Sequence, residues 1–94
     1  MREYRLYIHG EFVESVSKQT FESINPFNQQ VIAKVSRANA EDAKRAIVAA
    51  RKAFDNGPWT TMAKEERSAL IKAISDRING RKNELEVLEV EDSG

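Results

Sequence analysis

The sequence of 94 residues predicts an α+β fold in which two N-terminal β-hairpins are followed by three amphipathic helices. Three observations lead to this prediction. Apolar and polar residues alternate in the first third of the chain, which is the two-residue period of a strand. From residue 39 onward apolar residues recur at intervals of three and four, which is the period of a helix face. Turn-forming pairs such as His9-Gly10 and Asn25-Pro26 interrupt the strand segments.

The first hairpin is predicted over residues 4–15, because alternating segments flank a pair that can form a tight two-residue turn, His9-Gly10. The turn fixes the expected cross-strand pairs, which are Leu6–Val13, Tyr7–Phe12 and Arg5–Glu14. Each such pair contributes about 0.2–1 kcal/mol.

The second hairpin is predicted over residues 20–35, where two segments rich in β-branched and aromatic residues flank a polar connection. Pro26 lacks an N–H and holds Asn25 in an extended conformation, so the first strand should end there.

The clearest helix is predicted over residues 39–56. Asn39 can cap its first turn through the side-chain oxygen. At the other end, Gly57 allows a left-handed stop and Pro58 prevents continuation. The apolar stripe that this helix should bury consists of Ala43, Ala46, Ile47, Ala50 and Phe54.

Two further helices are predicted over residues 63–79 and 81–92. Ala63 cannot accept a capping hydrogen bond, so the first of them should fray at its start. Asn79-Gly80 is expected to end that helix. The inward side chains should be Leu70, Ile71, Ile74 and Ile78 in the first helix and Leu85 and Leu88 in the second, with Val87 as a further candidate.

The composition argues against several classes of partner. The 15 basic and 15 acidic side chains cancel, and a nucleic-acid binder should show a basic excess. No segment approaches the roughly 20 apolar residues that span a bilayer. A cytoplasmic protein without nucleic-acid or membrane partners is therefore the expectation.

No catalytic or cofactor-binding residue is predicted. The chain has no cysteine, no glycine-rich phosphate-binding motif and no metal-ligand spacing. His9, the only histidine, is interpreted as a solvated turn residue because no Cys or Ser partner lies near it. The acidic residues 84–92 are interpreted as a solvated face. Their charge opposes the helix dipole, so the helix is either weakly held or lies near a cation.

Five motifs follow one another along essentially the whole chain. They are LYIHGEFV at 6–13, TFESINP at 20–26, AIVAARKAF at 46–54 with GPW at 57–59, ER at 66–67, and LEVLEVEDSG at 85–94. In this order and spacing they resemble the N-terminal segment of the NAD(P)-dependent aldehyde dehydrogenase superfamily. The departures are at His9, where Asn or Asp is usual, at Asn28-Gln29, which replaces Thr-Gly, at the uncapped Ala63, and at Glu86 and Glu91, which replace residues that are usually apolar. A residue other than glycine must therefore adopt any positive φ in the second turn.

The resemblance implies the N-terminal part of an α/β, Rossmann-like oxidoreductase subunit. In this family a cysteine thiolate attacks an aldehyde, hydride passes to NAD or NADP, and the thioester is hydrolysed. The parent enzyme is expected to be a homodimer or homotetramer. Its catalytic and nucleotide-binding motifs lie beyond Gly94, so the chain 1–94 is expected to be an inactive fragment of the coenzyme-binding domain region. Its partner would be the remainder of the enzyme.

The resemblance also implies a site for a monovalent cation, K⁺ or Na⁺. Its ligands would be the main-chain oxygens of Ser23 and Ile24 and the carboxylate of Asp92, the oxygen donors that a hard cation prefers. At least one further ligand would come from beyond Gly94. The competing interpretation is that Asp92 is a solvated acid.

The alternative to a fragment is a free-standing, non-catalytic interaction module. Such a module would fold cooperatively without an uncovered apolar face, whereas a fragment would expose one.

Overall fold

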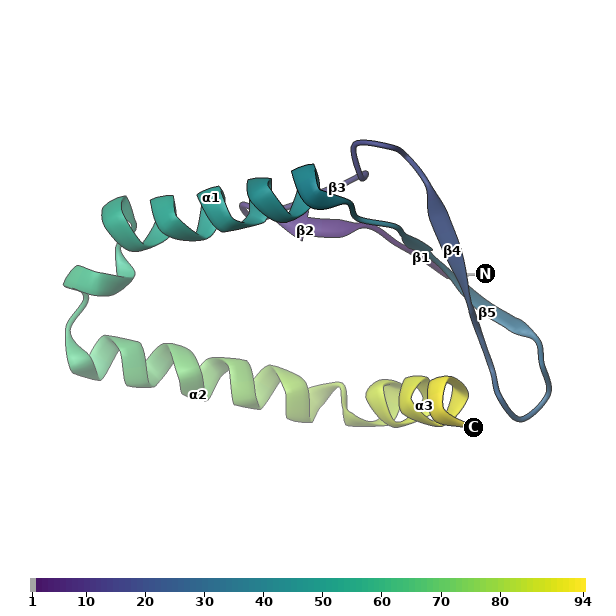
Figure 1. Cartoon of the computed structure of the whole chain (residues 1–94). Helices are drawn as coiled ribbons and strands as arrows, with labels where there is room; N and C mark the ends of the chain where they lie inside the picture. Colours follow the sequence, from purple (N-terminus) through teal and green to yellow (C-terminus); the bar gives the residue numbers. More distant parts are fainter. Residues whose placement is uncertain (1) are drawn as a thin grey trace.

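The computed structural model describes residues 2–94 and has the predicted α+β order, strands first and helices after (Figure 1). The strands are β1 (Arg2–Tyr4), β2 (Leu6–Ile8), β3 (Glu11–Val13), β4 (Thr20–Ile24) and β5 (Val31–Ser36). The helices are α1 (Ala40–Asn56), the short 3-10 helix η1 (Trp59–Thr61), α2 (Lys64–Gly80) and α3 (Lys82–Ser93).

The second predicted hairpin is formed by β4 and β5, which pair antiparallel. Their ladder is irregular between Ser23 and Ile24. Gln29 takes the left-handed turn position with a φ of 62°, so a non-glycine residue does carry the positive φ. β1 adds to the free side of β5 in parallel, which gives the sheet order β1-β5-β4.

The first predicted hairpin is shorter than residues 4–15. β2 and β3 pair as a separate two-stranded sheet through an exposed turn at His9 and Gly10, with φ values of 54° and 76°. The predicted pairs Leu6–Val13 and Tyr7–Phe12 form, but the pair Arg5–Glu14 does not, because both strands end before it.

The prediction that Tyr4 belongs to the first hairpin is also wrong. Tyr4 belongs to β1 and pairs with Val35 of β5. A parallel partner so distant in sequence leaves no mark on the local alternation of residues.

The helix α1 begins where it was predicted to begin, at the cap residue Asn39. The Asn39 side chain accepts a hydrogen bond from the Asp42 N–H at 3.1 Å, and the Asp42 carboxylate accepts one from the Asn39 N–H at 2.9 Å. These two bonds form a reciprocal capping box, which satisfies donors at the start of the helix.

The end of α1 differs from the prediction. Gly57 is extended, with φ −80° and ψ 168°, and not left-handed. Its N–H donates to the Ala53 carbonyl oxygen at 2.8 Å, and a Cβ at this position would lie 2.3 Å from that oxygen. Glycine is therefore needed here for close approach and not for a positive φ.

The helices α2 and α3 each end one residue later than predicted. Gly80 is the last residue of α2 and does not interrupt it, and Arg81 separates the two helices with φ −111° and ψ 19°. Ala63 provides no side-chain cap to α2, as expected.

The described residues form an open arrangement with little core. Ala33 is the one buried apolar residue among them, and the predicted inward residues Ile47, Ile71 and Ile74 are 68%, 59% and 59% exposed. The radius of gyration is 16.9 Å, whereas a compact chain of this length has about 12 Å. The accessible surface is 7855 Å², against about 5500 Å² for a compact protein of this mass. The apolar stripes of α1 and α2 are thus uncovered within residues 2–94.

Candidate cation site

The predicted cation ligands lie where the C-terminal part of α3 meets β4, at the end of the molecule that Figure 1 places on the right. Ser23 and Asp92 are 69 residues apart in sequence, and the Ser23 hydroxyl donates a hydrogen bond to Asp92 Oδ1 at 3.1 Å. Ile24 directly follows Ser23 in β4, and this adjacency is what places it near the site. The structure therefore brings Ser23 and Asp92 together and places Ile24 beside them.

The backbone at this point departs from a regular ladder. The irregularity between Ser23 and Ile24 is typical of a β-bulge, which leaves main-chain groups outside the regular pairing. Main-chain oxygens of this kind are the donors that the family resemblance assigns to the cation.

Two further contacts hold the end of α3 in place. Arg2 Nη1 lies 2.6 Å from Glu91 Oε2, and this hydrogen bond raises the pKa of Arg2. Gly94 has a φ of 81° and sits against the Asn25-Pro26 turn, where an added Cβ would lie 3.3 Å from the Pro26 Cβ. The contacts of Glu91 and Gly94 thus hold the backbone on either side of Asp92.

A cleft of 510 Å³ separates the sheet from α3 next to the site. Its walls are largely apolar and include Val35, Leu85 and Leu88, with Ser23 and Asp92 at its polar margin. Leu88 is partly covered here, as predicted, whereas Leu85 remains 42% exposed.

The donor set suits a hard cation better than a transition metal. Within residues 2–94 no three His, Cys, Asp or Glu side chains come together as a metal-binding group. The available donors are the Asp92 carboxylate, the Ser23 hydroxyl and nearby main-chain oxygens, which are the ligands of alkali and alkaline-earth ions.

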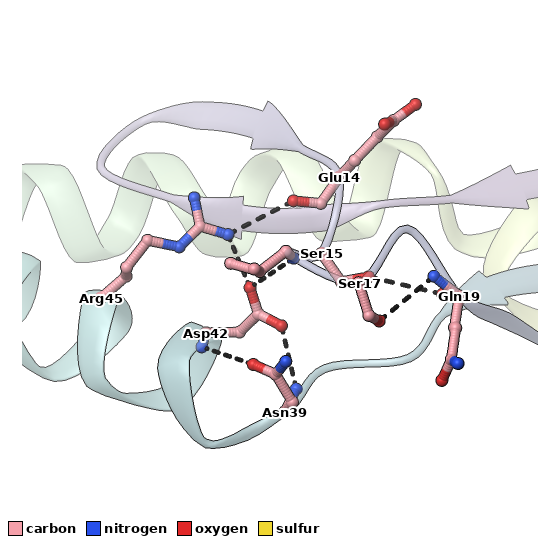
Figure 2. Close-up of polar contacts among 8 residues, drawn as sticks. Glu14, Ser15, Ser17, Gln19, Asn39, Asp42 and Arg45 are labelled. Atoms are coloured by element: carbon pink, nitrogen blue, oxygen red, sulfur yellow. Dashed lines mark hydrogen bonds and ion pairs between the residues drawn. The ribbon is translucent and has the colours of Figure 1, made fainter.

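A second polar cluster was not found by sequence reasoning. Asp42 is only 2% exposed, and besides the capping box it accepts hydrogen bonds from the Val16 N–H at 3.0 Å and from Arg45 Nη2 at 2.7 Å. The Arg45 guanidinium also donates to the Glu14 carbonyl oxygen at 3.3 Å (Figure 2). Hydrogen bonds from the Asn39 N–H, Arg45 and Val16 lower the pKa of Asp42, against the opposing effect of its burial.

The cluster around Asp42 fastens the start of α1 to the connection between β3 and β4. The Asn-x-x-Asp spacing of residues 39–42 could have revealed the capping box. The bond to Val16 joins residues 26 apart, so no local pattern could have revealed it. Among the described residues no buried side-chain nitrogen or oxygen lacks a hydrogen-bond partner, which makes this a structural cluster.

No helix in the described part of the chain has the length and apolar character needed to cross a membrane.

Comparison with known proteins agrees with the motifs. The model of the aldehyde dehydrogenase family matches residues 12–94. Aldehyde dehydrogenase 1 of Tanacetum cinerariifolium is 43% identical over 90 residues, which is 96% of this chain and 18% of that protein. Betaine aldehyde dehydrogenase of Bacillus subtilis is 43% identical over 89 residues, 95% of this chain and 18% of that protein.

Solved structures give the same result. The NAD⁺ complex of an aldehyde dehydrogenase from Bacillus cereus superposes with a TM-score of 0.95 at 42% identity, covering 99% of this chain and 19% of that one. A betaine aldehyde dehydrogenase from Staphylococcus aureus, also bound to NAD⁺, gives 0.90 at 48% identity, covering 94% and 18%. The chain spans about a fifth of the length of these relatives, matches the N-terminal part of their structures, and belongs to the aldehyde dehydrogenase family.

Proposed function

We propose that residues 1–94 form the N-terminal part of the coenzyme-binding domain region of an NAD(P)-dependent aldehyde dehydrogenase. The family match over residues 12–94 is the observation that carries this proposal. The complete enzyme oxidises a small-molecule aldehyde to a carboxylic acid through a cysteine thioester and assembles as a homodimer or homotetramer. This chain has no cysteine and is inactive by itself, because the thiol nucleophile must come from the remainder of the enzyme.

In this proposal the residues described above act as scaffold. A bound NAD or NADP would supply the hydride acceptor in the complete enzyme. The uncovered stripes of α1 and α2 pack against the remainder of the enzyme, and their exposure supports this role over that of a free-standing module.

The activity is tested on the purified product of the intact gene. NAD⁺ and NADP⁺ reduction is followed by absorbance with a panel of aldehydes that includes betaine aldehyde and benzaldehyde, and the 94-residue chain alone is the control. We expect turnover by the intact product and none by the control. Failure of the intact product with every aldehyde and both coenzymes would contradict the proposal, and so would turnover by the 94-residue chain.

We also propose that the main-chain oxygens of Ser23 and Ile24 and the Asp92 carboxylate hold a monovalent cation. The contact between Ser23 and Asp92 and the irregular ladder beside it support this assignment. A cation at this point would reduce the repulsion between Asp92 and the unfavourable end of the α3 dipole.

The cation site is tested by the dependence of thermal stability on K⁺ and Na⁺ in the intact gene product, because a bound ion raises the melting temperature as its concentration rises. Asp92→Asn should remove this dependence. Ser23→Ala should keep most of it, because its main-chain oxygen remains. Glu86→Gln, an exposed acid on the same helix, is the matched control. An unchanged response to K⁺ and Na⁺ in Asp92→Asn would contradict the site.

A further inference from the structure

A groove of 590 Å³ lies between α1 and the end of β2, outside the candidate cation site. Its lining consists of Ile8, His9, Glu41, Lys44, Arg45, Val48, Ala49 and Lys52. The groove is shallow and open to solvent, so it would contact one side of a bound molecule and not enclose it.

The groove is on the face of α1 opposite its apolar stripe. At 100° per residue, the helix positions that line the groove, centred on Val48, point roughly 140° away from the stripe that contains Ala43, Ile47 and Phe54. Packing of the stripe against the remainder of the enzyme would therefore leave the groove open to solvent.

Not all basic side chains that line the groove are paired with an acidic group. Arg45 is engaged by Asp42 and by the Glu14 carbonyl oxygen. Lys44 and Lys52 have no acidic partner within 4.0 Å in the described part of the chain. The one acid of the lining, Glu41, stands at the opposite end from Lys52, about 16 Å away along the helix axis.

The acid nearest to Lys52 in sequence outside the lining is already neutralised. Asp55 accepts a hydrogen bond from Arg51 Nε at 3.1 Å. Lys52 therefore has no ion-pair partner in the described part of the chain, and it lies at the end of the groove farthest from Glu41.

The floor next to Lys52 is apolar. Val48 lies one helical turn before Lys52, about 6 Å along the axis, and is 57% exposed although it is a β-branched aliphatic residue. Ala49 and Ile8 continue this surface toward the hairpin. An apolar strip that ends at an uncompensated ammonium group is complementary to a molecule with an alkyl chain and one terminal anion.

We propose that this groove binds an amphiphilic carboxylate, with its carboxylate at Lys52 and its alkyl chain along Val48, Ala49 and Ile8. Lys44 adds attraction at longer range. The inference concerns a surface site and does not depend on the proposed oxidation of aldehydes.

The test uses a photoreactive octanoic acid that carries a diazirine at the end of its chain, with the intact gene product. Mass spectrometry locates the cross-links. We expect saturable labelling of the peptides that contain Ile8 and Val48, competition by octanoate, and no competition by acetate. The alcohol analogue should label these peptides several-fold less, because it lacks the charge.

Lys52→Glu should weaken octanoate competition at these peptides at least threefold, since an exposed ion pair is lost and a repulsion is added. Val48→Ser should weaken it while keeping all charges. Lys64→Glu, a charge reversal on an exposed lysine of α2, is the matched control and should leave labelling unchanged. All three positions are exposed, so the variants should fold, and circular dichroism checks this.

Three results would overturn the proposal: labelling confined to peptides elsewhere in the enzyme, equal labelling by the acid and the alcohol, or an unchanged response in Lys52→Glu. Because labelling is measured without turnover, failure of this site and failure of the proposed activity are separate outcomes.

Discussion

The helices α1 and α2 have the same length of 17 residues, but α1 concentrates its apolar residues on one face far more strongly than α2, and the two are also held differently in the structure. α1 has a capping box and is bound through Asp42 and Arg45 to the connection after β3. α2 has no side-chain cap and no buried residue, and its recorded ion pair, Lys72 with Asp76, is internal to the helix. The apolar faces of both helices are uncovered within residues 2–94, so the difference between them lies in the polar contacts that hold the start of α1. Periodicity thus identifies a helix, but it does not tell what holds the helix in place.

Among the substitutions that test this comparison, Ile74→Ala is expected to have the largest effect on stability. In the 94-residue chain Ile74 is 59% exposed, so the substitution should change stability by less than about 0.5 kcal/mol. In the intact gene product, where we propose that α2 is covered, it should cost about 2–5 kcal/mol. Hydrogen exchange of the α2 amides, measured by mass spectrometry in both forms, gives the two values.

Lys72→Ala, on the other face of α2, is the control for that comparison and should have little effect in either form. Equal effects of Ile74→Ala in the two forms would mean that α2 stays uncovered in the longer protein.

Substitution of two glycines by alanine tests the two segments that join the helices. Gly57→Ala would bring a Cβ into the Ala53 carbonyl oxygen and should destabilise the chain by about 1–3 kcal/mol. Gly80→Ala meets no atom within 4 Å and lies in a helical turn, so it should stabilise α2 by up to about 1 kcal/mol. Urea denaturation followed by circular dichroism distinguishes the two signs, and a stabilising Gly57→Ala would disprove the close approach at the end of α1.

Asn39→Ala tests the contribution of the side-chain cap, which α1 has and α2 lacks. Loss of the hydrogen bond from the Asp42 N–H should cost about 1 kcal/mol, with faster hydrogen exchange confined to the first turn of α1. Asn39→Asp should retain most of the stability, because a carboxylate also accepts this bond. Equal loss in both variants would point to a role for Asn39 other than capping.

The smallest change is expected from pH. The pKa of Asp42 is lowered in the folded state, so the unfolded chain takes up the proton first, near the ordinary value of about 3.9. The stabilisation by this carboxylate is therefore complete above that pH and is lost as pH falls through the folded-state pKa. Wild type and Asp42→Asn should differ by a constant amount between pH 7 and 5, and the difference should shrink below about pH 4. A difference that already shrinks at pH 6 would assign the effect to another group.

Local patterns were sufficient for the elements that depend on local interactions. The turn at His9 and Gly10, the end of β4 before Pro26 and the cap at Asn39 each follow from a residue's own backbone preference or from a hydrogen bond to a near neighbour. The assignment of each segment as strand or helix followed from the two-residue and the three- and four-residue spacing of its apolar residues.

The remaining features depend on residues that are distant in sequence, so local patterns could not predict them. The assignment of Tyr4 failed because its pairing partner is Val35, and the role of Asp42 was missed because Val16 lies in another connection. At the candidate cation site, Ser23 and Asp92 were proposed only through the family resemblance, since no spacing rule relates a strand residue to one 69 positions later.

The contact between Ser23 and Asp92 also sets an order of events during synthesis. At about 5–20 residues per second, the ribosome adds the 69 residues that separate them in roughly 3–14 s. During that interval the β4–β5 hairpin can form, but neither Asp92 nor the anchor of Arg2 on Glu91 exists. The first described strand and the last helix are therefore joined late, and until then the first strand depends on its pairing with β5.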